Sequence, residues 1–284
     1  MLQKNCSDPF FVADAHLHLW DAHARYYPWL CDRAVNFRYG DYSALPRRYA
    51  LENYRADTGR WEVTHGVYVE AEWDPDDPLG EMAFIESIRT QNGFPTVAVA
   101  QAWLDRANCA QVLEAHAQRA FVRGVRHKPK SGMMDDAQWR SGFAQLAPLG
   151  LHFELQAPWP QLEEAARLAR DFPDTTIVLN HAGLPSDEDL PAWRKALAAL
   201  AACPNVAVKI SGLGKVKRKR EVVLTAIDLF GVQRAMFASN FPVDRLCASF
   251  DEIYTGFREI THELPETDRR ALFRDNALRI YRME

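Results

Sequence analysis

Eight short apolar runs, rich in β-branched and aromatic residues, alternate along this chain with longer stretches of helical periodicity. The runs cover residues 12–19, 64–70, 96–102, 122–126, 151–156, 175–180, 206–210 and 235–239. Such alternation predicts βα units around a parallel sheet. Eight units in a chain of 284 residues is the number that closes a (β/α)8 TIM barrel. We therefore expect an α/β fold with a single barrel domain over residues 1–284.

The stretches between the runs carry helix start signals. Two aspartates at 135–136 precede one helical stretch, Pro160 precedes another, and the acidic segment 186–189 precedes a helix predicted over 190–202. Residues 269–281 have the pattern of a closing amphipathic helix. Because no linker, repeat or low-complexity tract interrupts the series, one domain is the simplest organisation.

One connection is much longer than the others. Residues 21–60 follow the first predicted strand and are rich in aromatic side chains, including Tyr26, Tyr27, Trp29, Tyr39 and Tyr42. A loop that follows a barrel strand belongs to the catalytic face. We expect this loop insertion to lie over the active-site face, either as a substrate lid or as packing over the barrel mouth.

Composition excludes several classes of function. The net charge is −4 and 25% of residues are charged, with one dense basic run at 215–220 that reads as a solvated loop. Apart from that run, this charge pattern lacks the clustered basic residues that are typical of nucleic-acid-binding or membrane-binding proteins. The five cysteines lie far apart, which favours reduced thiols, and no signal peptide or bilayer-length apolar span is present. We expect a cytoplasmic protein with a small-molecule partner, and a homo-oligomer remains an open alternative.

The first strand ends in a His-x-His pair. On a β-strand, alternate side chains point to the same side, so His16 and His18 aim at one point, where they can share an ion or polarise a substrate oxygen. The alternative is a pair of core histidines that are satisfied by hydrogen bonds.

Polar side chains also collect at the ends of other strands, where a barrel places its working residues. Those singled out are Glu70, Arg126, His127, Gln156, His181, Lys209, Ser211, Asn240 and Asp244. Three of them have a structural alternative. Glu70 can neutralise Arg126, Lys209 can pair with Glu154 inside the barrel, and Asn240 can cap a turn.

Five motifs in strand order resemble the amidohydrolase superfamily. They are Asp-Ala-His-Leu-His-Leu-Trp at 14–20, Gly-Val-Arg-His at 124–127, Val-Leu-Asn-His-Ala-Gly-Leu-Pro at 178–185, Val-Lys-Ile-Ser-Gly-Leu at 208–213 and Phe-Ala-Ser-Asn-Phe-Pro-Val-Asp at 237–244. Within that superfamily they are most similar to the branch of sugar lactonases and 2-pyrone-4,6-dicarboxylate lactonases. The resemblance covers essentially the whole chain.

The resemblance implies hydrolysis of a lactone by water. His16, His18 and His181 match the imidazoles that polarise the carbonyl or hold a metal. Asn240 stands where most of the superfamily has the aspartate that takes the proton of water, and an amide cannot accept that proton. The remaining candidates for the base are Asp244, Glu70 and His181, with Asp14 a further one because strand alternation puts it on the face of His16.

The resemblance also bears on metal content. The histidine of the fifth strand in two-metal members is missing, because Gln156 occupies that strand end and His152 lies at its beginning. One divalent metal, zinc or manganese, held by His16, His18 and His181 is one expectation. No metal at all is the other.

The expected substrate is anionic or polyhydroxylated. Arg126, His127 and Lys209 would supply positive potential, with Gln156 and Ser211 as further polar contacts. Trp20 and Trp159 would offer a flat apolar face, with core packing as the alternative.

We expect a hydrolase acting on the ester of a sugar-acid or pyrone-dicarboxylate lactone. The alternatives are a decarboxylase of an aromatic or muconate acid and a non-catalytic ligand-binding barrel.

Overall fold

The computed structural model describes residues 11–32 and 38–283 and shows eight parallel strands arranged as a nearly closed barrel. In order around the sheet these are β1 (Phe11–Leu17), β4 (Glu62–Val69), β5 (Val97–Gln101), β6 (Val122–Arg126), β7 (His152–Leu155), β8 (Ile177–Leu179), β9 (Val206–Ile210) and β10 (Ala235–Phe237). All eight predicted strands are present and the (β/α)8 TIM barrel is confirmed. The boundaries of β6 and β9 coincide with the predicted apolar runs, and those of the other six strands differ by one or two residues at an end.

Backbone contacts just beyond β10 bring the two ends of the sheet together. The amide of Asn240 donates to the carbonyl of His16, and the amide of His18 donates to the carbonyl of Phe241, both at 2.8 Å. Leu17 and Phe241 form a parallel bridge at the same place. The two segments that carry the His-x-His pair and Asn240 are therefore hydrogen-bonded neighbours.

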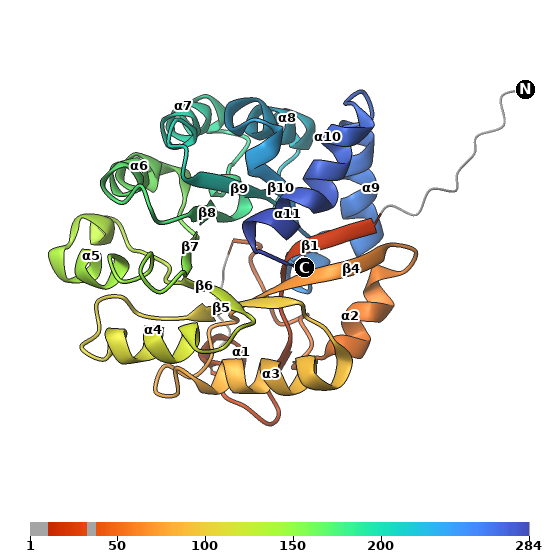
Figure 1. Cartoon of the computed structure of the whole chain (residues 1–284). Helices are drawn as coiled ribbons and strands as arrows, with labels where there is room; N and C mark the ends of the chain where they lie inside the picture. The colour runs from red at the N-terminus through yellow and green to blue at the C-terminus, as the bar shows by residue number, and fades with distance from the viewer. Residues whose placement is uncertain (1–10, 33–37, 284) are drawn as a thin grey trace, which may run out of the picture.

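Helices surround the strands (Figure 1). They are α1 (Pro28–Cys31), α2 (Leu51–Thr58), α3 (Gly80–Asn92), α4 (Cys109–Ala117), α5 (Ala137–Phe143), α6 (Leu162–Asp171), α7 (Leu190–Ala201), α8 (Lys219–Phe230), α9 (Phe250–Ile260), α10 (Glu266–Arg270) and α11 (Asn276–Ile280). The predicted start signals are found where expected. Asp136, for example, caps α5 by accepting the amide of Trp139 at 2.9 Å.

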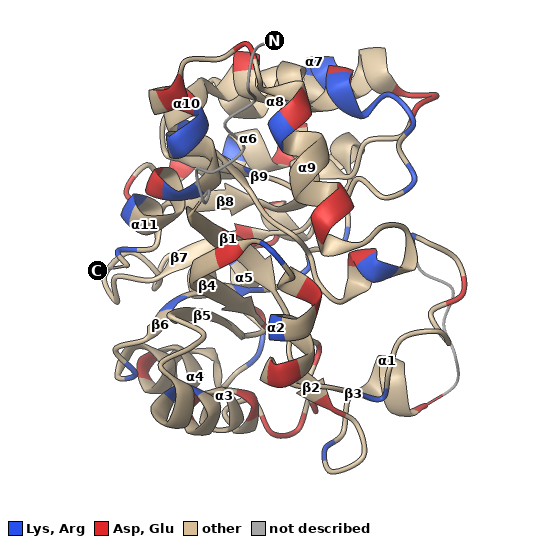
Figure 2. Cartoon of the chain, turned by 90° about the vertical axis from the view of Figure 1, so that its right-hand side faces the viewer, with Lys and Arg blue, Asp and Glu red and all other residues tan. Residues whose placement is uncertain are grey.

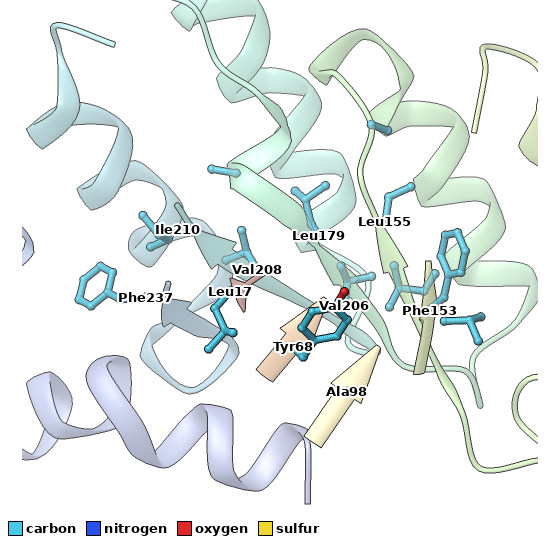
Figure 3. Close-up of a cluster of buried hydrophobic side chains, with 14 of the residues drawn as sticks. Leu17, Tyr68, Ala98, Phe153, Leu155, Leu179, Val206, Val208, Ile210 and Phe237 are labelled. Carbon is cyan, nitrogen blue, oxygen red and sulfur yellow. The ribbon is translucent and has the colours of Figure 1, made fainter. Parts of the chain in front are cut away.

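Two apolar layers hold the barrel together. Outward-facing strand residues, such as Tyr68, Phe153, Leu179 and Val208, pack in the layer beneath the helices (Figure 3). The inward-facing cluster consists largely of small residues, namely Ala13, Ala15, Val67, Val69, Val97, Val99, Val178, Ala207, Met236 and Ala238. Tyr281, near the C-terminus, belongs to the same inner cluster. Small side chains suit a barrel interior that is just wide enough to be filled.

A bulge in β1 overturns the predicted orientation of Asp14. Asp14 pairs with Gly66 and Leu17 with Tyr68, so three steps along β1 match two along β4. The carboxylate of Asp14 accepts the hydroxyl of Tyr54 at 2.7 Å, on α2. Asp14 therefore points outward and holds helices against the barrel, which removes it as a candidate base.

The predicted insertion divides into two parts. Its second part forms α2, which packs against α9 as a helix of the barrel. Its first part contains α1 and a short antiparallel pair, β2 (Trp20–Asp21) with β3 (Arg48–Tyr49), while residues 33–37 of the predicted insertion lie outside the described residues. Figure 2 shows α1 and the C-terminus at opposite ends of the barrel.

No helix in the described part of the chain is both long and apolar enough to cross a membrane.

Candidate active site at the barrel mouth

A cavity of about 280 Å³ lies at the carboxyl ends of the strands. Seven of the eight barrel strands contribute their end or the residues just after it, β5 being the exception. The lining residues are His18, Trp29, Arg38, Tyr39, Tyr42, Ala71, Glu72, Arg126, Lys128, Gln156, His181, Leu184, Gly212, Asn240 and Val243. This is the end of the barrel at which the fold places active sites.

Backbone strain concentrates around this cavity. Among the described residues, six that are not glycine have a positive φ, and four of these line the cavity: Glu72, His181, Leu184 and Asn240. Such conformations are unfavourable for residues with a Cβ and persist only where the surrounding structure imposes them. The clustering is an indication of function that is independent of residue type.

The His-x-His pair converges as predicted. The Nε2 atoms of His16 and His18 lie 3.2 Å apart, and Nδ1 of His18 lies 2.8 Å from the carbonyl oxygen of Val69. Because a carbonyl only accepts, Nδ1 of His18 carries a proton and Nε2 of neutral His18 has a lone pair. His16 is fully buried beneath His18, and its Nδ1 has no hydrogen-bond partner in the described structure.

His181 joins the pair from the other side of the site. Its ring centroid lies 4.7 Å from that of His16, and its Nδ1 lies 2.9 Å from Oγ of Ser211. Gly212 makes room for this ring, since a Cβ there would lie 2.8 Å from Nδ1 of His181. The three predicted imidazoles are thus brought together by β1 and by the segments after β8 and β9.

All three imidazoles are held neutral. Burial lowers the pKa of His18 to about 3, with Arg126 as the next cause. Burial also takes the pKa of His16 and that of His181 well below the usual value, followed by the charge of Lys209 for His16 and of Arg38 for His181. Near neutral pH each of these rings therefore keeps a lone pair, with which it can accept a hydrogen bond or ligate a metal.

Asn240 is fixed by a carboxylate behind it. Its Nδ2 donates to Oδ1 of Asp244 at 2.7 Å, and the hydroxyl of Tyr39 donates to the same oxygen at 2.8 Å. Burial raises the pKa of Asp244 to about 6, against these hydrogen bonds. Asp244 does not line the cavity, because the side chain of Asn240 lies between the Asp244 carboxylate and the cavity.

Two ion pairs lie on the opposite wall. Arg126 contacts the Glu70 carboxylate through Nε, donates to the Glu70 carbonyl at 2.6 Å through Nη2, and donates to Oε1 of Gln156 at 2.8 Å. Burial tends to raise the pKa of Glu70, but the charges of Arg126 and Lys128 outweigh it and hold that pKa below the usual value. Lys128 pairs with Glu72 in turn. Glu70 is therefore a partner of Arg126 that lies outside this cavity.

The residues fit a metal ion only in part. Two imidazole nitrogens at 3.2 Å have the spacing of two ligands on a tetrahedral ion, and the Val69 carbonyl orients His18 as metal-bound histidines are usually oriented. However, the described residues contain no group of three His, Cys, Asp or Glu side chains arranged to hold a metal. The predicted set of His16, His18 and His181 is thus not assembled as a coordination site.

Other predicted substrate contacts lie elsewhere. Nδ1 of His127 accepts from the Leu104 amide at 3.2 Å and the Trp139 indole at 3.0 Å, which turns the imidazole away from the three histidines. The Nζ atom of Lys209 lies 2.8 Å from Glu154, and both side chains are completely buried inside the barrel. This pairing is the one that the sequence analysis gives as the alternative to a role of Lys209 in substrate binding.

The aromatic side chains that line the cavity are not the two tryptophans that were predicted to contact the substrate. Trp20 is 1% exposed, donates to the Pro46 carbonyl at 2.8 Å, and packs against Trp29 and Tyr49. Neither Trp20 nor Trp159 lines the cavity. Ser211 acts through His181 and does not line it either.

Six cavity residues were not among the predicted site residues: Trp29, Arg38, Tyr39, Tyr42, Glu72 and Lys128. The sequence places Glu72 just after a predicted strand, but it was not singled out as a site residue. The richness of 21–60 in aromatic residues was a signal for three of them. Nothing in the local pattern distinguished Arg38 from the other arginines of that segment.

Comparison with known proteins adds to this geometry. A family model described as amidohydrolase matches residues 13–283. The uncharacterized protein y4mH of Sinorhizobium fredii is 39% identical over 292 residues, covering 96% of this chain and 98% of that protein. The L-fucono-1,5-lactonase of Burkholderia multivorans is 27% identical over 294 residues, covering 94% of this chain and 95% of that protein.

A solved structure agrees with these matches. The crystal structure of an amidohydrolase from Burkholderia multivorans with bound zinc has a TM-score of 0.83 at 26% identity. The match covers 96% of this chain and 100% of that one.

Proposed function

Because the chain belongs to the amidohydrolase family, we propose that it is a hydrolase that opens a small lactone by attack of water on the ester carbonyl. A relative named as a lactonase matches almost the whole chain. The observation that carries the proposal is the cavity at the barrel mouth, where two neutral imidazoles, two guanidiniums and two side-chain amides face one small space.

Lactone hydrolysis needs a group that takes a proton from water. Of the three remaining candidates, Glu70 is bound to Arg126 and Asp244 lies behind Asn240, whereas His181 lines the cavity. The proposal requires the tautomer in which Nδ1 of His181 donates to Oγ of Ser211, because Nε2 then carries the lone pair and is the acceptor. We therefore assign the base to His181.

The reaction also needs donors for the negative charge that develops on the carbonyl oxygen. Arg126 has five N–H groups, of which three are used by Glu70 and Gln156, so two remain for a substrate oxygen. Its partners hold the guanidinium in place before the substrate binds, and preorganised donors are the most effective kind.

Hydrolysis then takes place in two steps. The water oxygen bonds to the carbonyl carbon while His181 takes one proton, and Arg126 stabilises the resulting oxyanion. The ring C–O bond then breaks, and the leaving alkoxide takes the proton from His181. The products are a carboxylic acid and an alcohol on one open chain.

Proton release measures this activity directly. The purified protein is assayed against aldono-1,4- and 1,5-lactones and pyrone dicarboxylates, and turnover of at least one class is expected. Release of carbon dioxide from an aromatic acid, with no lactone hydrolysed, would instead support the decarboxylase alternative. If none of the substrates is turned over, the remaining hypothesis is that the protein is a non-catalytic ligand-binding barrel.

His181→Gln tests the assigned base. This variant should lower kcat/KM by about 10²- to 10⁴-fold, the usual contribution of a general base. Ser211→Ala should cost less, because it removes only the group that orients His181. Equal activity of wild type and His181→Gln would refute the assignment.

A further inference from the structure

Arg38 stands out among the charged residues of the cavity. Its Nη2 donates to the carbonyl of Pro185 at 2.9 Å, while its Nη1 is shielded from solvent and has no hydrogen-bond partner in the described structure. No carboxylate in the described residues lies within ion-pair distance of this guanidinium. A shielded donor without an acceptor is costly, so such an atom calls for a ligand.

The charge balance of the cavity points the same way. Its lining includes three cations, Arg38, Arg126 and Lys128. Arg126 is neutralised by Glu70 and Lys128 by Glu72. The imidazoles add no charge, so Arg38 is the one cation of this lining without a paired carboxylate in the described residues; its charge acts from further away on Asp244, behind Asn240, whose pKa it lowers.

The neighbours of Arg38 hold it in place. Tyr39, the next residue, donates to Asp244 at 2.8 Å, and its ring stacks on Tyr42 with a centroid distance of 6.2 Å and an interplanar angle of 8°. Pro185 follows directly after the strained segment that contains His181 and Leu184. The guanidinium is therefore bound to the wall that carries the proposed base, and the residue that follows it in the chain is bound to Asp244.

We propose that Arg38 forms an anion subsite that selects lactones carrying a free carboxylate, an inference that rests on the proposed function. A guanidinium with one edge tethered and another unpaired suits a carboxylate, the commonest partner of such a fork. The cavity of about 280 Å³ limits the ligand to a small ring. The substrate class is thus the lactone of a sugar diacid or a similar small lactone acid.

A matched pair of substrates tests this subsite. The neutral member is an aldono-1,4-lactone, and the charged member is the corresponding aldarolactone, in which a carboxylate replaces the terminal hydroxymethyl group. Wild type should hydrolyse the aldarolactone with at least about 10-fold higher kcat/KM. Arg38→Gln should lose about 10- to 100-fold on the aldarolactone, mainly through KM, and less than about 3-fold on the neutral lactone.

Two further variants control for charge and for folding. Arg38→Lys keeps the charge but not the fork, so it should recover only part of the loss. Arg55→Gln removes the same charge from α2, where Arg55 lines a different depression with Trp20 and Leu51. It should leave the preference for the aldarolactone unchanged.

A binding measurement separates this inference from the proposed function. If neither lactone is hydrolysed, the proposed function fails, and calorimetry with the ring-opened aldarate still tests the subsite. Binding to wild type that is weakened at least about 10-fold in Arg38→Gln supports the inference. Equal binding to both proteins, or equal losses on both lactones in Arg38→Gln, overturns it.

Discussion

The side-chain amide of Asn240 donates a hydrogen bond of 2.7 Å to Oδ1 of Asp244, one helical turn further along the chain. The amide therefore turns its nitrogen toward Asp244 and its oxygen away from it. The interaction of Asn240 with His18 raises the pKa of that imidazole, against the larger effect of burial. Position 240 thus carries no carboxylate, but the carboxylate of Asp244 lies next to it and is hydrogen-bonded to the side-chain amide of Asn240.

Asn240→Asp should impair this protein. Two buried carboxylates would face each other where an amide now donates, and such a pair cannot be fully ionised. We expect kcat/KM to fall at least about 10-fold at pH 8 and less at pH 5, where the pair takes up a proton. The double variant Asn240→Asp/Asp244→Asn restores one carboxylate and one amide, and should recover most of the lost thermal stability. Higher activity of the single variant would show that Asn240 disables the site.

Asp244 should make stability depend on pH. Because its pKa is raised to about 6 in the folded protein, the unfolded chain loses this proton first, near the ordinary aspartate pKa of about 4. Stability contributed by the protonated form is therefore lost as pH rises from about 4 to 6. This difference in pKa between the folded and the unfolded protein corresponds to about 3 kcal/mol. The difference in unfolding free energy between wild type and Asp244→Asn should change by that amount over this range, and a constant difference would contradict the pKa.

Glu70→Gln should destabilise the fold. It would leave the buried guanidinium of Arg126 without its counter-charge, which costs about 3–5 kcal/mol. Glu86→Gln is the matched control, because Glu86 pairs with Arg119 at the surface and its loss should cost less than about 1 kcal/mol. Chemical denaturation measures both. If Glu70→Gln were as stable as wild type but inactive, Glu70 would be the base after all.

The buried Lys209–Glu154 pair is expected to be structural. Lys209→Met leaves the Glu154 carboxylate with its hydrogen bonds from Asn180 and Tyr281 but without its counter-charge inside the barrel, and should cost about 3–5 kcal/mol. Adding Glu154→Gln removes the stranded charge and should restore part of that loss. Additive effects of the two substitutions in denaturant unfolding would argue against direct coupling.

Removal of metal should leave most of the activity. Only two imidazoles have ligand spacing in the described residues. Protein treated with a chelator, with its residual metal measured by elemental analysis, should keep kcat/KM within about 3-fold of the untreated value. A complete loss that one equivalent of zinc restores would show that a third ligand is recruited.

Much of the fold was readable from local sequence. Apolar runs such as 122–126 and 206–210 match β6 and β9 to the residue, because strands buried on both faces carry continuous β-branched sequence. The end of a strand can also be recognised from the local sequence. Once the strand order was known, it was therefore predictable that one end of the barrel would collect His16, His18, His181 and Asn240.

Other assignments depended on geometry that sequence does not encode locally. The bulge between Asp14 and Leu17 breaks the alternation of β1, which turned Asp14 away from the face of His16. The orientation of His127 was decided by the Trp139 indole and the Leu104 amide, which reach it from neighbouring loops.

By itself, the sequence determined the barrel and the place of its chemistry, because strand periodicity and strand ends are properties of short segments. Tertiary structure decided which polar residues face the cavity and which neutralise one another. Several contacts depend on how the barrel brings side chains together. Examples are the pairing of Arg126 with Glu70, that of Asn240 with Asp244, and the hydrogen bond from Arg38 to the carbonyl of Pro185. Burial and counter-charges then set the protonation of each group, and both exist only once the barrel has closed.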